Sequence, residues 1–210
     1  EGREAIELLR EALRALDRKP PDDFLGLPVL PATYARSVLA ASLAETGNFR
    51  EAAAQASDAA RRAISSGQPD SIMWADWSRG LVSLLRGAAG DAVRIFEHVH
   101  DLCRAHDLDA YTSRAMAGLG CASARLGMVN EGLQLLEKAV AMDASAEPKV
   151  TRSFALNALA EALFLAGEEA GALAACNQAL QFTREHQERG AEAYACFLLG
   201  LIQNTRIGQS

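Results

Sequence analysis

The residues with the clearest capacity for chemistry lie in the segment HVHDLCRAH, residues 98–106. It contains His98, His100, Cys103 and His106, side-chain types that bind Zn²⁺. The segment has helical periodicity, and on a helix the rise from His100 to His106 is about 9 Å. Because zinc ligands lie about 2 Å from the ion, one straight helix cannot bring three of these residues to one metal. We therefore predict no metal and no other cofactor. The remaining alternative is a metal-binding or enzymatic role of this helix, with two ligands completed by another helix.

Other signatures of catalysis are missing from the sequence. The motifs GxSxG, GxxxxGK[ST] and HExxH do not occur, so hydrolase, nucleotide-binding and zinc-protease chemistry have no support. The segment GAAGDA, residues 87–92, has glycines but no lysine and no preceding strand, and it favours a turn between helices over a phosphate-binding loop. We expect no catalytic residue and predict that the chain is not an enzyme.

The elements that carry these residues are predicted to be helices. The chain has 210 residues, of which 50% are hydrophobic and 6% aromatic, and its many alanines favour closely packed helices. A net charge of −6 disfavours nucleic-acid binding, which needs clustered Lys and Arg. No run of about eighteen apolar residues could span a membrane. The four cysteines lack CxxC spacing and indicate reduced thiols of a cytoplasmic protein.

Glycine and other small residues recur at a spacing of forty residues (87−47, 127−87, 167−127). The glycine column is Gly47, Gly87, Gly127 and Gly167. Two columns of small residues accompany it: Ala40, Gly80, Gly120, Ala160 and Gly200 before the glycine, and Ala52, Ala92, Gly132 and Ala172 after it. Small residues let two helices approach closely, and a glycine between helices can adopt the left-handed conformation that ends the first of them. The pattern therefore predicts repeated helix pairs.

This register predicts helices at 2–18, 33–46, 49–66, 70–86, 89–106, 109–126, 129–144, 148–166, 169–187 and 190–204. We expect one domain over 1–210: the second helix of a truncated repeat (1–18), a Pro-rich insertion (19–32), repeats at 33–72, 73–112, 113–152 and 153–192, a final unpaired helix (193–204) and a tail (205–210). The apolar residues of the insertion, Phe24, Leu25, Leu27, Val29 and Leu30, are expected to pack along the helices. The chain begins in a helical pattern without Met, and we interpret it as a fragment of a longer protein.

The columns resemble tetratricopeptide (TPR) repeats over about residues 33–203. That family has a small residue within its first helix, a glycine at the turn and a small residue early in its second helix, although its usual period is about 34 residues. The resemblance implies an all-α fold, a right-handed superhelix (α-solenoid) of antiparallel helix pairs. The segment QFTREHQERGAEAYACFLLGLI further resembles the TPR-like arrays of large bacterial STAND-type and LuxR-like regulators and of multidomain nucleotide cyclases.

In TPR-like stacks the first helices line the concave face, and aromatic residues recur near the start of the predicted first helices. This column holds Tyr34, Trp74, Phe154 and Tyr194, with Arg114 in the third repeat. Three residues later, the column holds Ser37, Trp77, Ala117, Asn157 and Phe197. We predict a groove with aromatic anchors and Arg114 as an anion contact; the alternative is that the tryptophans pack between repeats. Only Asn157 fits the Lys and Asn pattern of carboxylate-binding TPR proteins, so no such clamp is expected.

Charged residues stand where other repeats carry apolar ones. Arg36, Asp76 and Arg79 replace residues such as Met116 and Leu119, and either an ion pair between repeats or a polar pocket between the first two repeats would explain them.

The resemblance implies a non-catalytic scaffold domain of a larger bacterial signalling or transcription-regulatory protein. Its expected partners are a protein or peptide, or other domains of the parent protein, and a homo-oligomer is left open. The alternative is a sensor that binds a small effector within the superhelix.

Overall fold

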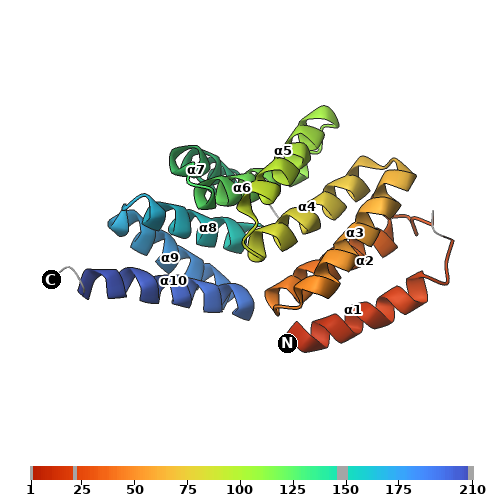
Figure 1. Cartoon of the computed structure of the whole chain (residues 1–210), viewed down its shortest axis with the longest axis horizontal. Helices are drawn as coiled ribbons and strands as arrows, with labels where there is room; N and C mark the ends of the chain where they lie inside the picture. The colour runs from red at the N-terminus through yellow and green to blue at the C-terminus, as the bar shows by residue number, and fades with distance from the viewer. Residues whose placement is uncertain (1, 21–22, 146–150, 208–210) are drawn as a thin grey trace. The chain divides into compact units, whose positions relative to one another are not determined.

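The computed structural model describes residues 2–20, 23–145 and 151–207, and within these ranges the chain forms ten α-helices and no strand. The helices are α1 (Gly2–Leu16), α2 (Pro31–Glu45), α3 (Phe49–Ser66), α4 (Pro69–Leu85), α5 (Ala89–Ala105), α6 (Asp109–Arg125), α7 (Val129–Ser145), α8 (Arg152–Leu165), α9 (Glu169–Glu185) and α10 (Arg189–Ile207) (Figure 1). The prediction of an all-α fold is confirmed. The bounds agree with the predicted helices to within a few residues, and the expected start of the eighth helix at 148 lies outside the described residues.

The chain divides into two compact units, Glu1–Asp109 and Ala110–Ser210. In the first unit, α2 packs against α1, α3 and α4, and α4 also packs against α3 and α5. In the second unit, α8 packs against α7, α9 and α10, and α9 packs against α10. In each unit, two first helices (α2 and α4, or α8 and α10) thus contact each other as well as their chain neighbours, which is the pairing of a solenoid-like helical repeat.

Most residues of the small-residue columns are buried between helices, although Gly200 in α10 is exposed. Ala40, Ala52, Ala92, Ala160 and Ala172 are fully buried. Larger residues fill the space beside them: Leu39, Leu43, Met73 and Phe96 in the first unit, and Leu136, Leu156, Leu198 and Ile202 in the second. Small residues thus bring the backbones together, and neighbouring large side chains complete the packing.

The turn glycines adopt the conformation that the sequence predicts. Gly47, Gly87, Gly127 and Gly167 have φ angles of 81°, 85°, 96° and 77°, the left-handed region that a residue with a Cβ atom rarely enters. Each glycine lies two residues after the last residue of the first helix and two residues before the first residue of the second helix. The turns are therefore short, and the two helices of a pair lie side by side.

The Pro-rich insertion packs only in part. Val29 and Leu30 are buried, and the Leu30 amide donates a hydrogen bond of 3.0 Å to Ser71 Oγ on α4. Leu25 and Leu27 are exposed, so the expectation that they pack along the helices is wrong. The physical reason is a tight turn, in which Leu25 and Gly26 both have positive φ angles and the chain bends away before it reaches α2.

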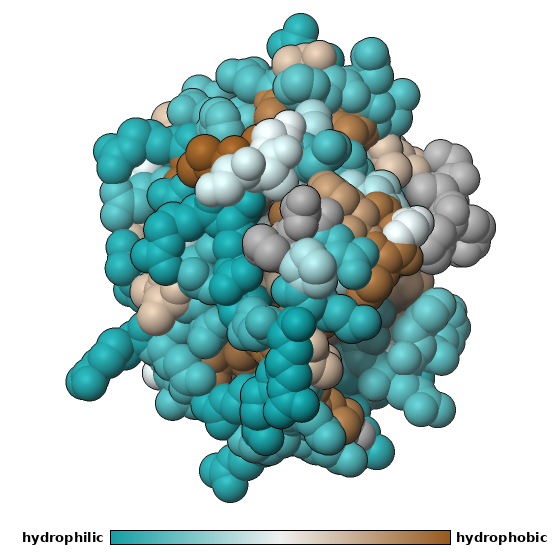
Figure 2. Space-filling view, turned by 90° about the vertical axis from the view of Figure 1, so that its right-hand side faces the viewer, coloured by the Kyte–Doolittle hydropathy of each residue, from teal (hydrophilic) through white to brown (hydrophobic). Residues whose placement is uncertain are grey.

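The face of the molecule seen in Figure 2 is mainly hydrophilic. In the space-filling view of Figure 2, hydrophobic residues form small separate patches among hydrophilic ones. Within the described ranges, no helix combines the length and apolar character that crossing a bilayer requires.

Candidate functional site

Two aromatic side chains of the predicted binding column meet in the first unit. Tyr34 on α2 and Trp74 on α4 have ring centroids 4.7 Å apart at an interplanar angle of 90°, the edge-to-face arrangement that aromatic pairs prefer. Tyr34 is 40% exposed, and Trp74 is half-buried. Because α2 and α4 are successive first helices in direct contact, the forty-residue register places an aromatic pair, partly open to solvent, across them.

Trp77 lies elsewhere. It is 6% exposed, and its ring centroid is 5.1 Å from that of Phe96 on α5. Phe96 itself is fully buried, with its ring against Gly80 of α4. Trp77 therefore belongs to the core between the two helices of its pair. Trp77 is therefore not an exposed anchor, and its ring contact with Phe96 lies within its own repeat, whereas the alternative predicts packing between repeats.

In the second unit, the predicted residues differ in their burial. Arg114, Phe154 and Tyr194 are half-buried. Asn157 is 4% exposed, and its Nδ2 donates a hydrogen bond of 3.0 Å to the carbonyl oxygen of Ala191. Asn157 thereby ties α8 to the first turns of α10, so its described contact is structural.

A polar cluster that the sequence did not predict joins α6, α8 and α10. Arg125 Nε and Nη2 donate to the two carboxylate oxygens of Glu161, both at 2.8 Å. The Tyr194 hydroxyl lies 2.9 Å from Glu161 Oε2 and 2.8 Å from Arg125 Nη2. The side chains of Arg125 and Glu161 are only 26% and 18% exposed. The three residues occupy different columns of the repeat, so periodicity gives no signal for their meeting.

Burial and the neighbouring charges shift the pKa values of Arg125 and Tyr194 in this cluster. Burial by itself lowers the pKa of Arg125, but the hydrogen bonds to Glu161 outweigh burial and raise the pKa of Arg125 above its ordinary value. Burial, followed by the Glu161 carboxylate, raises the pKa of Tyr194. The arrangement stabilises a charged Arg–Glu pair and a protonated tyrosine, which suits a structural connection between three helices.

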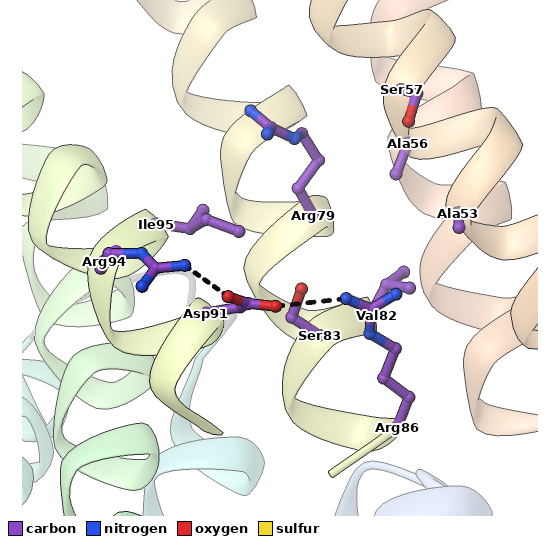
Figure 3. Close-up of a pocket in the computed structure, with 10 residues that line it drawn as sticks. All are labelled: Ala53, Ala56, Ser57, Arg79, Val82, Ser83, Arg86, Asp91, Arg94 and Ile95. Atoms are coloured by element: carbon purple, nitrogen blue, oxygen red, sulfur yellow. Dashed lines mark hydrogen bonds and ion pairs between the residues drawn. The ribbon is translucent and has the colours of Figure 1, made fainter. Parts of the chain in front are cut away.

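A polar pocket of about 350 Å³ lies within the first unit. Figure 3 shows its lining residues from α4 in the middle, with those of α3 on one side and those of α5 on the other. Three arginines, one aspartate and several small or apolar side chains line it: Arg79, Arg86, Arg94, Asp91, Ser57, Ser83, Ala53, Ala56, Val82 and Ile95. Arg79, Val82 and Ser83 of α4 and the C-cap residue Arg86 are spaced at i, i+3, i+4 and i+7, which places them along one face of the helix.

Ion pairs organise the pocket. Asp91, in the first turn of α5, contacts Arg94, and its Oδ2 lies 3.4 Å from Arg86 Nη2 (Figure 3). The turn at Gly87 allows this pairing, because it brings the end of α4 close to the start of α5. Arg79 donates a hydrogen bond of 2.7 Å to Asp76, whose other oxygen lies 3.0 Å from His98 Nδ1.

The charged residues at apolar repeat positions, Arg36, Asp76 and Arg79, form ion pairs, and one of them also lines a polar pocket. Arg36 pairs with Asp17 at 2.7 Å, an ion pair that reaches the end of α1, and with Asp58 on α3 at 2.6 Å. Arg79 pairs with Asp76 and also lines the polar pocket, which lies between residues of the first and second repeats.

The histidine-rich segment forms no metal centre among the described residues, where no three His, Cys, Asp or Glu side chains are placed to hold an ion. Cys103 is buried, whereas His106 is exposed and most of the His98 side chain is accessible. They point to different surroundings because a helix turns its side chains around its axis.

Comparison with known proteins identifies the fold. No family model matches the chain, and no curated protein matches it. A solved structure of a Rap protein complexed with Competence and Sporulation Factor matches with a TM-score of 0.60 and 14% sequence identity. The match covers 98% of this chain and 60% of the Rap chain, so the present chain spans 60% of that protein's length. The likeness shows a TPR-like helical repeat fold.

Proposed function

We propose that the chain is a non-catalytic, cytoplasmic binding module that holds a peptide or protein partner against its first helices. The observation that carries this proposal is the partly exposed Tyr34–Trp74 pair, which spans α2 and α4. Aromatic side chains that are accessible on a rigid helical surface are frequent centres of binding energy. Their edge-to-face contact fixes both rings before a partner arrives, which lowers the entropy cost of association.

The fold supports the same function. The Rap protein of similar fold was solved in complex with Competence and Sporulation Factor, so a helical repeat of this kind serves as a binding platform in at least one protein. The parent that we propose for this chain is a larger bacterial signalling or transcription-regulatory protein of the STAND, LuxR-like or cyclase type. Its other domains are further candidate partners. In the second unit, Arg114 and Phe154 are the proposed contributors.

Site-specific photo-crosslinking tests the proposal. A benzoylphenylalanine is placed at Tyr34, or at Ile64 as the control, in the full-length parent protein in its own cells. Ile64 is a matched position because it is an exposed hydrophobic residue of the second helix α3. We expect a specific crosslinked partner from position 34 and none from position 64. Equal yields of the same product from both positions would show that the first-helix face is not the binding surface.

A substitution then measures the contribution of the aromatic pair. Trp74→Ala should weaken the affinity for the crosslinked partner by about tenfold or more, the usual effect of removing a central aromatic contact. Circular dichroism of the variant confirms that its helices are intact. Unchanged affinity with unchanged helicity would contradict the proposal.

The second candidate function is the sensing of a small effector, and the pocket between α3, α4 and α5 favours it. This site is separate from the aromatic pair, so either function can be tested without the other.

A further inference from the structure

In the repeat register, the second repeat carries polar residues at two pocket positions where other repeats carry leucine. At the position of Arg79, the other repeats and the final helix carry leucine: Leu39, Leu119, Leu159 and Leu199. At the position of Ser83, the first and fourth repeats carry Leu43 and Leu163, and the third repeat carries Ser123. Leu39 is 1% exposed and Leu43 is fully buried, so these are core positions in the first repeat.

The replacement explains why a pocket forms there. A charged guanidinium is not buried without a partner, because the loss of its hydration is costly. The Arg79 side chain therefore extends toward solvent and is 43% exposed. Serine at position 83 fills less volume than leucine. The space left between α3 and α5 amounts to about 350 Å³, which is at the lower end of the range typical of small-molecule sites.

The arginines of this pocket retain unused hydrogen-bond donors. A guanidinium has five N–H groups. The described hydrogen bonds of Arg79 comprise one to Asp76, and those of Arg86 comprise one long bond of 3.4 Å to Asp91. Three arginines face two aspartates, Asp76 and Asp91, so the local charge is positive (3 − 2 = +1) in a chain whose net charge is −6.

The walls add an apolar component. Val82 from α4, Ile95 from α5 and Ala53 from α3 also line the pocket (Figure 3). A ligand complementary to this lining has an anionic group that accepts hydrogen bonds from arginine and a short apolar part that covers these side chains.

We propose that the pocket between α3, α4 and α5 binds a small organic anion. The carboxylate or phosphate of the ligand lies between Arg79 and Arg86, and its apolar part contacts Val82 and Ile95. Arginine suits this role because its planar group donates two parallel hydrogen bonds to either kind of anion. The site is distinct from the Tyr34–Trp74 pair, and it does not depend on partner binding there.

Titration of the chain with three related compounds tests the proposal. Benzoate presents a carboxylate, phenyl phosphate presents a phosphate, and benzamide is a neutral compound of the same shape. Binding is followed by the amide NMR signals of residues 53–57 and 79–95. We expect saturable shifts with benzoate, phenyl phosphate or both, and none with benzamide. The stronger of the two anions identifies the preferred group, and its affinity should fall as salt is added. No saturation by either anion up to about 10 mM, a weak affinity by any scale, would overturn the proposal, as would equal binding of benzamide.

Two substitutions locate the binding in the pocket. Arg86→Gln should weaken binding by about tenfold, because a charge-assisted hydrogen bond is lost. Ser57→Trp should weaken it as well, because Ser57 is an exposed residue at the edge of the pocket and a large ring there blocks entry. The matched control is Arg104→Gln, which removes an exposed arginine of α5 that does not line the pocket. An equal loss of affinity in this control would show that binding is only a general effect of charge.

A double substitution separates ligand binding from folding. Asp76→Met with Arg79→Leu restores the residues of the third repeat, Met116 and Leu119. Replacing a partly buried ion pair by apolar residues is often neutral or stabilising, so the melting temperature should stay the same or rise while anion binding is lost. Retention of full affinity in this folded variant would contradict the assignment of Arg79 to the site.

Discussion

Gly120 of α6 and Gly132 of α7 are in direct backbone contact. A Cβ atom on Gly120 would lie 2.8 Å from the carbonyl oxygen of Gly132, and a Cβ atom on Gly132 would lie 2.7 Å from that of Gly120. Both distances are shorter than van der Waals contact, and the opposing atoms belong to backbones that cannot rotate away. The pair therefore sets how closely α6 and α7 approach.

Gly132→Ala is expected to destabilise the protein by about 1–3 kcal/mol, the usual effect of inserting an atom into a filled interface. Chemical denaturation measures the change. The control is Gly200→Ala in α10, where a Cβ atom would meet nothing within 4 Å. This control should stabilise the chain by roughly 0.5–1 kcal/mol, because alanine favours a helix over glycine. Equal effects of the two substitutions would contradict the close contact.

Glu161→Ala should destabilise the second unit by about 1–3 kcal/mol. It leaves the largely buried Arg125 without its carboxylate partner, and the loss is below that of a fully buried pair because both side chains retain some exposure. Glu137→Ala, at an exposed position of α7, should change stability by less than about 0.5 kcal/mol. Arg125→Met combined with Glu161→Leu should cost less than Glu161→Ala alone, since no unpaired charge remains. An additive loss in the double variant would indicate that the pair is not coupled.

The two tryptophans should differ in their access to a fluorescence quencher. Trp74 is half-buried, whereas Trp77 is 6% exposed and packs on Phe96. Acrylamide should therefore quench the emission of Trp77→Phe, which retains Trp74, more strongly than that of Trp74→Phe, which retains Trp77. Both variants should reach the same quenching in denaturant. Equal quenching of the folded variants would contradict the placement of Trp77 in the core.

The cysteines should react in two classes. Cys196 is exposed, whereas Cys103, Cys121 and Cys176 are buried, and burial raises the pKa of Cys121 to about 12 and the pKa values of the other two to about 11. Since the thiolate is the reactive form, a thiol reagent should label one cysteine of the folded chain rapidly and the rest only after unfolding. Rapid labelling of Cys121→Ala should be the same as that of the unsubstituted chain.

The same thiols predict a pH dependence of stability. Their pKa values are raised in the folded chain above the ordinary 9.0, so the unfolded chain releases these protons first as pH rises. Their contribution is complete below about pH 9 and declines toward pH 11–12. The free energy of unfolding, measured in urea between pH 8 and pH 11, should fall. The decline should be shallower for Cys121→Ala, and an identical slope would exclude this thiol as a contributor.

The sequence by itself determined the helix pairs and their contact faces. Columns at forty-residue spacing predicted the turn at Gly87 and the close packing of Gly120 and Gly132, because close approach of two backbones permits only small residues and a left-handed turn favours glycine. The same columns showed that Arg79 occupies a leucine position. These are local requirements, and each is met by the residue type at one position.

Tertiary structure decided which residues form each surface. Trp74 and Trp77 stand three residues apart in neighbouring columns of the repeat, yet only the packing against Phe96 shows that Trp77 is in the core. Arg125, Glu161 and Tyr194 meet across separations of 36 and 69 residues. Periodicity fixes the direction of a side chain on its own helix, but its exposure and partners depend on how far each neighbouring helix is shifted and rotated. That geometry depends on the packing of many side chains together, and no single residue determines it.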